Sequence, residues 1–167
     1  RRLHMHYAGQ AELAGLGLRF SPGGKSVTSD PQLLERIVGN LIQNAIKYTD
    51  HGGIVVVARS TRSHLNLEVW DTGSGIDASE LPRIFDEFYQ AGNPERDRRG
   101  GLGLGLSIVR RLARLMKLPL ALHSRPGRGS RFVLDVPAFT HALCSVVSID
   151  EKESLPKMVI AVIDDDA

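Results

Sequence analysis

Glycine and leucine alternate over residues 101–106, and the sequence then passes without a break into an apolar helical pattern. Glycines at Gly101, Gly103 and Gly105 allow the backbone to take positive φ and to approach a ligand closely. The helix behind them begins with unpaired N–H groups and a positive dipole end, both of which favour an anion. The run therefore predicts a phosphate-binding loop that leads into a helix, and other residues must define the ligand.

Length and composition limit the number of domains and the kinds of partner and metal site that this chain can have. The 167 residues suffice for one globular domain and a tail, and 21 basic against 19 acidic residues argue against nucleic acid as a main partner. The single cysteine, Cys144, excludes an internal disulfide and a multi-cysteine zinc site. Because no run approaches the roughly 20 apolar residues of a membrane helix, we expect a fragment without membrane contact. We expect it to be cytoplasmic, within a parent protein that a membrane anchor elsewhere could tether. The chain begins in mid-pattern, which suggests a piece of a longer protein.

Local patterns predict an α/β domain. Asp30 and Pro31 mark the start of a helix that ends near Tyr48, and Ile54–Ala58 with Leu65–Trp70 read as an antiparallel hairpin. The long segment 72–100, with an amphipathic piece over 81–89, predicts a mobile lid. The other expected elements are helical character over 3–14, short strands over 15–20 and 26–28, a helix over 105–116, and closing strands over 119–123 and 131–136.

Two asparagines, Asn40 and Asn44, share one face of the predicted helix. An amide oxygen can coordinate Mg²⁺ held between phosphates, and Lys47, one turn on, can reach a phosphate. Solvated polar residues on an ordinary helix would show the same pattern, so the pair by itself leaves both interpretations open.

Asp71 directly follows a predicted strand and precedes Gly73 and Gly75. A carboxylate there can accept a hydrogen bond from the exocyclic amine of adenine, and the glycines let the backbone pass close to a flat base. An ordinary Asp/Gly turn is the alternative. Phe85 and Phe88 would either anchor the lid on the domain or belong to the core of a short helix.

The order of these motifs resembles the N, G1, F and G2 boxes of sensor histidine kinases: Asn40-x-x-x-Asn44, Asp71-x-Gly73-x-Gly75, Phe85-x-x-Phe88 and Gly101-x-Gly103-x-Gly105. Gly127-x-Gly129-Ser130-x-Phe132 is similar to the last glycine motif of that family, so the match spans 15–137. The resemblance implies the fold shared with type II topoisomerase and Hsp90 ATPases. That fold is a two-layer α/β sandwich with helices on a mixed, largely antiparallel sheet.

The same resemblance implies the ligands, ATP and Mg²⁺, and a role for each matching residue. Asn44 would bind Mg²⁺, and Asn40 and Lys47 would assist at the phosphates. The remaining nucleotide contacts would come from Tyr48, Asp71, Gly73, Gly75, Ile76 and Ser130 around the base, and from Gly101, Leu102, Gly103, Leu104 and Gly105 around the phosphates. The spacing does not select which of Arg96, Arg98 and Arg99 contacts phosphate.

Position 40 separates branches of this superfamily. Members that hydrolyse ATP carry a glutamate four residues before the magnesium-binding asparagine, whereas this sequence has Asn40, and an amide cannot act as a general base. The resemblance therefore favours a protein-histidine kinase over an ATPase. A degenerate module that senses ATP or ADP without phosphotransfer is the alternative. A Rossmann domain fits less well, because its glycine loop follows a strand.

None of the six histidines lies in the context of a phospho-acceptor, so the fragment is not expected to autophosphorylate alone. We expect residues 1–14 to end a dimerisation helix and its junction, 15–137 to form the catalytic domain, 138–156 a linker, and 157–167 the first strand of a truncated receiver domain. The parent would be a homodimeric hybrid kinase and the fragment a monomer. Its partners would be the dimerisation domain and a receiver domain or response regulator.

Overall fold

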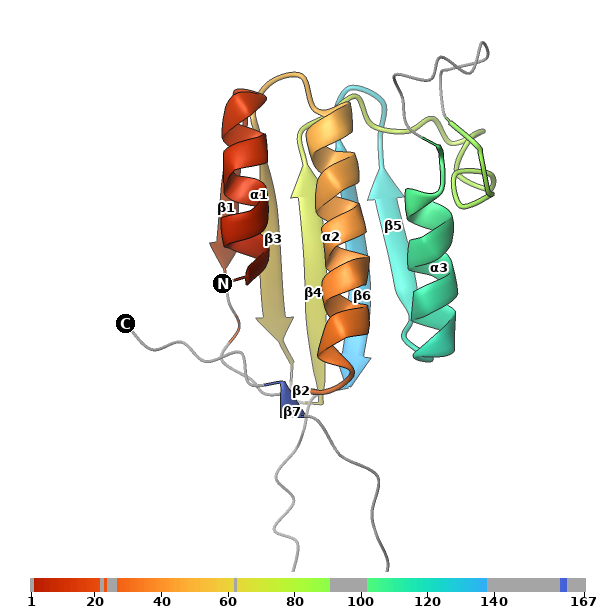
Figure 1. Ribbon diagram of the computed structural model, residues 1–167. Coiled ribbons are helices and arrows are strands. Elements are labelled where there is room, and N and C mark those ends of the chain that lie inside the picture. The colour runs from red at the N-terminus through yellow and green to blue at the C-terminus, as the bar shows by residue number, and fades with distance from the viewer. Residues whose placement is uncertain are drawn as a thin grey trace, which may run out of the picture.

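The computed structural model describes residues 2–21, 23, 27–61, 63–90, 102–137 and 160–161 (Figure 1). In chain order the elements are α1 (Arg2–Leu13), β1 (Gly17–Ser21), β2 (Val27–Thr28), α2 (Pro31–Tyr48), β3 (Gly53–Ser60), β4 (His64–Asp71), α3 (Gly105–Leu115), β5 (Leu120–Ser124), β6 (Ser130–Pro137) and β7 (Ile160–Ala161).

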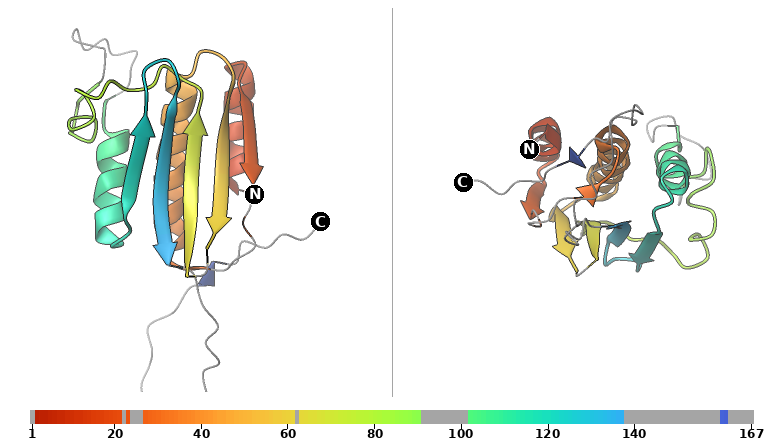
Figure 2. Two further views of the ribbon diagram at one scale, coloured as in Figure 1. Left: turned by 180° about the vertical axis from the view of Figure 1, so that it is seen from behind. Right: turned by 90° about the horizontal axis from the view of Figure 1, so that it is seen from below.

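The chain forms two layers. The sheet has five strands in the order β1-β3-β4-β6-β5, with β1 parallel to β3 and the other pairs antiparallel. Helices α1, α2 and α3 lie on one face, and no described helix covers the other (Figures 1 and 2). The predicted sandwich of helices on a mixed, largely antiparallel sheet is therefore confirmed. None of the described helices combines the length and apolar character needed to cross a membrane.

Helix α2 forms for local reasons. Asp30 is its N-cap, and its Oδ1 accepts hydrogen bonds from the backbone N–H groups of Gln32 (2.9 Å) and Leu33 (3.1 Å). Pro31 stands at the first helical position, as predicted. The apolar stripe of the helix is buried: Leu34, Ile37, Val38, Leu41, Ile42 and Ala45. This stripe packs on the sheet and fixes which face of α2 remains available to a ligand.

Strand alternation supplies the other half of the core. Along β6, the side chains of Phe132, Leu134 and Val136 are buried, while the residues between them are more exposed. On β4, Leu65 and Val69 are buried in the same layer. The sheet therefore presents one apolar face to the helices, and its strand ends carry the polar residues of the site.

The structure refines two of the expectations from the sequence. The amphipathic piece over 81–89, for which a short helix was one alternative, is a series of turns, with the N–H of Ile84 bonded to the carbonyl of Glu80 (3.2 Å) and that of Asp86 to the carbonyl of Arg83 (2.8 Å). Phe88 ends this series at a φ of 62°, which a continuing helix does not allow. The last strand also begins earlier than predicted, because Ser130 pairs with Ser124.

Two short strands far apart in the sequence, β2 and β7, pair with each other outside the five-stranded sheet. β2 lies where a strand was predicted over 26–28, and it pairs antiparallel with β7, with Val27 opposite Ala161. The predicted linker over 138–156 and the rest of the expected receiver strand lie outside the described residues.

Candidate functional site

A cavity of about 190 Å³ opens between α2, the start of α3 and the ends of β4 and β6. Segment 74–90 forms its outer wall. Six residues predicted from the sequence line it together: Asn44, Tyr48, Asp71, Gly75, Ile76 and Ser130. The other lining residues are Ala45, Ser74, Glu80, Ile84, Tyr89, Gln90, Leu106 and Phe132.

Asp71 is the only acid on the strand-end wall of this cavity among the described residues. Its Oδ1 accepts hydrogen bonds from the backbone N–H groups of Gly73 (2.9 Å) and Ser130 (3.1 Å). Burial raises the pKa of this carboxyl, and the two backbone hydrogen bonds oppose the rise. Within the described part of the chain, nothing donates to Oδ2. One oxygen is thus held by the fold, and the other is available to a donor from a ligand.

Glycines let two loops approach this carboxylate. A methyl group added at Gly73 would lie 2.2 Å from the carbonyl oxygen of Tyr48, and one at Gly75 would lie 2.0 Å from that of Arg125. Gly75 also has a φ of 69°, where side chains are disfavoured. Both positions therefore require glycine, and the resulting close packing shapes the wall of the cavity.

Serine hydroxyls connect the same wall. Ser124 Oγ accepts a hydrogen bond from the N–H of Ile76 (2.8 Å) and lies 3.0 Å from Ser130 Oγ. The hydroxyl of Ser124 also donates to the carbonyl of Gly129 (3.1 Å). Sequence reasoning did not select Ser124, because its role depends on strand pairing between β5 and β6.

The start of α3 lies against the two asparagines of α2. A methyl group added at Gly105 would lie 3.4 Å from Asn44 Oδ1 and 3.5 Å from Asn40 Oδ1. Leu104 occupies the N-cap position and provides no side-chain hydrogen bond, so the first N–H groups of α3 have no side-chain cap. Asn40 Nδ2 donates to the carbonyl of Arg36 (2.7 Å). The structure therefore brings uncapped helix N–H groups and two amide oxygens to one place.

Lys47 lies beside Tyr48 rather than on the cavity wall. Its Nζ donates a hydrogen bond to the hydroxyl of Tyr48 (2.6 Å) and lies 4.3 Å from the centre of the tyrosine ring. Tyr48 itself lines the cavity and is 40% exposed. Lys47 is therefore next to the cavity, and Tyr48 is the residue that connects the two.

The glycine-leucine run is joined to the end of the outer wall. Gly103 has a φ of 68°, and its carbonyl accepts a hydrogen bond from the N–H of Phe88 (3.1 Å). Leu102 is 73% exposed, so its side chain makes no part of the cavity wall. Phe85 packs against the core, whereas Phe88 is 59% exposed, so only the first of the two phenylalanines anchors this segment. Gly101 and the three arginines at 96, 98 and 99 lie outside the described residues.

The outer wall contains residues that the sequence did not single out. Tyr89 donates a hydrogen bond to Glu80 Oε1 (3.3 Å), and the guanidinium of Arg83 lies 4.5 Å from the centre of the Tyr89 ring. Ile84 is buried at the back of this wall. The amphipathic pattern over 81–89 could have identified Ile84, but no sequence signal pairs Tyr89 with Glu80.

Comparison with known proteins supplies a family context. A sequence model of the family described as "Histidine kinase-, DNA gyrase B-, and HSP90-like ATPase" matches residues 29–140. The sensor histidine kinase RcsC of Salmonella typhimurium is 41% identical over 114 residues, which cover 68% of this chain and 12% of RcsC. The sensor histidine kinase CusS of Escherichia coli is 41% identical over 130 residues, which cover 77% of this chain and 27% of CusS. The chain thus spans between about an eighth and about a quarter of these relatives.

Solved structures show the same fold. Full-length ShkA in complex with AMPPNP superposes with a TM-score of 0.73 at 28% identity, covering 85% of this chain and 30% of ShkA. The catalytic domain of the histidine kinase ThkA, in a nucleotide-free form, gives a TM-score of 0.70 at 23% identity and covers 82% of this chain and 88% of that domain. The second likeness extends over nearly all of a domain solved as a separate unit.

Proposed function

The chain belongs to the family of histidine kinase-, DNA gyrase B- and HSP90-like ATPases, and we propose that it is the ATP-binding catalytic domain of a two-component sensor histidine kinase. In this proposal it delivers the γ-phosphate of ATP to a histidine on a separate dimerisation domain. The observation that carries the proposal is Asp71: one carboxylate oxygen is held by backbone N–H groups, and the other has no donor in the described part of the chain.

We assign the adenine to the strand-end side of the cavity. Asp71 Oδ2 would accept the hydrogen bond of the exocyclic amine, because a charged acceptor forms the stronger hydrogen bonds. Gly73, Gly75, Ile76 and Ser130 would shape the pocket around the base, and Tyr48 would lie against it. The apolar residues Ile84, Leu106 and Phe132 line the same cavity and suit a flat, largely apolar ring.

We assign the phosphates to the start of α3. The uncapped N–H groups at Leu104–Gly105 would bind phosphate oxygens, with Gly101, Leu102 and Gly103 wrapping around them and Asn40 and Lys47 assisting. Asn44 would hold Mg²⁺ through its amide oxygen. No group of three or more His, Cys, Asp or Glu side chains that could hold a metal occurs in the described residues, so the phosphates themselves would complete the coordination. When bound, Mg²⁺ neutralises charge on the phosphates during transfer.

We propose transfer to histidine rather than hydrolysis because of Asn40. Its Nδ2 is bonded to the carbonyl of Arg36, and its amide cannot take a proton from water. The acceptor histidine, and a receiver domain or response regulator further along the phosphorelay, would belong to other domains. The kinase activity of this chain would then require a supplied dimerisation domain.

The test is Mg²⁺-dependent ATP binding by the isolated chain, measured by titration calorimetry. Asn44→Ala should weaken the part of the affinity that depends on Mg²⁺, and Asp71→Ala should weaken binding with or without the metal. Gln43→Ala is a matched control, because Gln43 is an exposed amide on the same helix and does not line the cavity. Unchanged affinity in both site variants would refute the assignment.

A second measurement separates a kinase from a nucleotide sensor. The chain is mixed with a dimerisation domain from a histidine kinase and with γ-labelled ATP. Label on the acceptor histidine supports the kinase. ATP binding without transfer to any supplied domain supports the alternative, a regulatory module that only senses ATP or ADP.

A further inference from the structure

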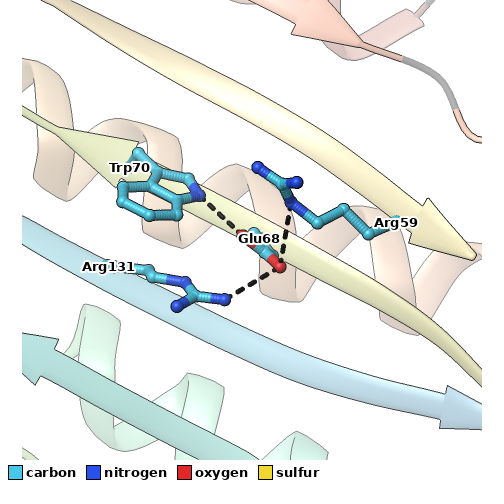
Figure 3. A network of polar contacts seen from close by, with 4 residues as sticks. All are labelled: Arg59, Glu68, Trp70 and Arg131. Atoms are coloured by element: carbon cyan, nitrogen blue, oxygen red, sulfur yellow. Dashed lines mark hydrogen bonds and ion pairs between the residues drawn. The ribbon is translucent and has the colours of Figure 1, made fainter. Parts of the chain in front are cut away.

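Glu68 is a buried carboxylate on the uncovered face of the sheet. Its side chain is 1% exposed, although no described helix covers this face. Glu68 Oε2 accepts a hydrogen bond from Trp70 Nε1 (2.7 Å), and Oε1 accepts one from an Arg131 terminal nitrogen (3.0 Å). Arg59 Nε lies 3.4 Å from the same Oε1 (Figure 3). We call these four residues the Glu68 network; it joins β3, β4 and β6.

The network lies directly behind the cavity. Trp70 and Arg131 are opposite each other in the pairing of β4 with β6, and the next residues toward the cavity are Asp71 and Ser130. These two are joined by the hydrogen bond from the Ser130 N–H to Asp71 Oδ1 (3.1 Å). Because successive side chains alternate between faces, the network and the cavity share the backbone of these strands but none of their side chains.

Charge balance ties Arg131 to Glu68. The guanidinium of Arg131 lies 4.6 Å from the centre of the Trp70 ring, and its Nε is buried without a hydrogen-bond partner among the described residues. The carboxylate of Glu68 is therefore the group that compensates its charge. Neutralising Glu68 would leave a partly buried cation unpaired, and Arg131 would have to move toward water. Because Arg131 is adjacent to Ser130 in β6, such a movement would act on the backbone next to Ser130.

We propose that the Glu68 network positions Asp71 and Ser130 for recognition of the nucleotide base. Glu68, Trp70 and Arg131 are then positioning residues that act through the β4–β6 pairing without touching the ligand. This inference rests on the proposed function, because it assumes that Asp71 reads the base.

The chain offers a matched control on the same two strands. His64 Nδ1 lies 2.8 Å from Asp135 Oδ1, which also links β4 to β6, but at the end of the strands far from Asp71. A substitution of Asp135 perturbs a polar contact between the same two strands, at side chains more exposed (46% for His64 and 34% for Asp135) than Glu68 (1%). It therefore reports the effect of weakening a contact between β4 and β6 that lies away from the cavity.

The experiment compares Glu68→Gln with Asp135→Asn and the wild type. Affinities for ATP and GTP are measured with Mg²⁺ present, and folding is checked by urea unfolding. Glu68→Gln should reduce the preference for ATP over GTP by about fivefold or more, while Asp135→Asn should keep it within about twofold of the wild type. The affinity for inorganic triphosphate, which carries no base, should be unchanged in both.

A double-mutant cycle distinguishes positioning from a purely structural role. If Glu68 acts through Asp71, then Glu68→Gln should not alter the ATP-to-GTP ratio further once Asp71→Asn is present. Should Glu68→Gln fail to fold, Trp70→Phe replaces it. That change removes the indole N–H donor to Glu68 and reduces the ring surface against Arg131, keeps the charge of Glu68, and should lower the ratio in the same direction by about twofold.

Two results would overturn the inference alone: a folded Glu68→Gln variant with the ratio of the wild type, or an equal loss in Asp135→Asn. A wild-type chain that binds neither nucleotide would instead overturn the proposed function, and the inference with it.

Discussion

Replacing Asp71 with asparagine isolates one atom of the site. In the wild type, the backbone N–H groups of Gly73 and Ser130 both point at Oδ1. In Asp71→Asn these two donors would hold the amide oxygen, so the NH₂ group would take the place of Oδ2. The substitution thus converts the atom that faces a ligand from an acceptor to a donor while the bonds to the fold are kept.

The magnitude follows from the hydrogen bond that is lost. A hydrogen bond to a charged acceptor contributes about 1.5–3 kcal/mol, so ATP should bind roughly 10- to 150-fold more weakly. GTP should lose less or gain, because guanine presents an acceptor, O6, where adenine presents its amine. The preference for adenine should therefore shrink or reverse.

The stability of this variant should not fall with its affinity. Burial raises the pKa of Asp71 in the folded protein, so the ionised form is disfavoured by folding, and a neutral amide of the same shape avoids that penalty. The free energy of unfolding at neutral pH should equal or exceed that of the wild type. Competition titrations with ATP and GTP, together with urea unfolding, measure both quantities. Asp71→Asn binding ATP within twofold of the wild type would show that Oδ2 does not read the base.

Three further outcomes concern the titration of Asp71, the turn at Gly129 and the N-cap of α2. Because burial raises the pKa of Asp71 above its ordinary 3.8, this carboxyl should be protonated at a higher pH than a free aspartate, and ATP binding should weaken on acidification. The affinity of the wild type is divided by that of Asp71→Asn at each pH, because the protonation of ATP affects both equally. This ratio should fall as the pH is lowered. Gly129→Ala should destabilise the fold by at least about 1–2 kcal/mol more than Gly127→Ala in urea unfolding. Both have positive φ (77° and 71°), but only the former places a methyl 2.0 Å from a backbone carbonyl, that of Asp71. Asp30→Ala should cost about 1 kcal/mol through loss of the N-cap, and an unchanged urea midpoint would contradict that role.

Local signals in the sequence were sufficient for most of the fold. The start of α2 at Pro31 depends on a cap and a proline that are adjacent in the chain, and the hairpin of β3 and β4 depends on two apolar runs joined by a short loop. The turns over 81–89 were not predicted, because Phe88 adopts a positive φ that is uncommon for phenylalanine. The N–H of Phe88 bonds to the carbonyl of Gly103, a contact between segments that the local sequence pattern does not contain.

The sequence predicted part of the cavity lining but not the contacts that connect it. Asn44 and Asp71 were selected from spacing and from a strand end, and the structure places both on one cavity. The sequence did not predict that the Ser130 N–H donates to Asp71 or that Ser124 contacts both Ile76 and Ser130. These contacts depend on pairing between strands, and the first joins residues far apart in the sequence. The sequence also did not predict the Glu68 network. A glutamate within a strand pattern is expected to face solvent, and Glu68 is buried because side chains from β3, β4 and β6 contact it.

The polarity of the cavity determines how a nucleotide can enter it. One end carries the carboxylate of Asp71, and the other carries Leu106 at the positive end of α3, beside Asn44. Phosphates placed at Asp71 would meet a negative charge and lose the N–H groups of the helix, whereas a base placed at α3 would leave those groups unpaired. Both penalties disfavour the reversed orientation, so in the proposed complex the base would lie at the strand ends and the phosphates at α3. If the proposed function is correct, the same geometry that recognises the base would also direct the terminal phosphate toward the end of the cavity where transfer would occur.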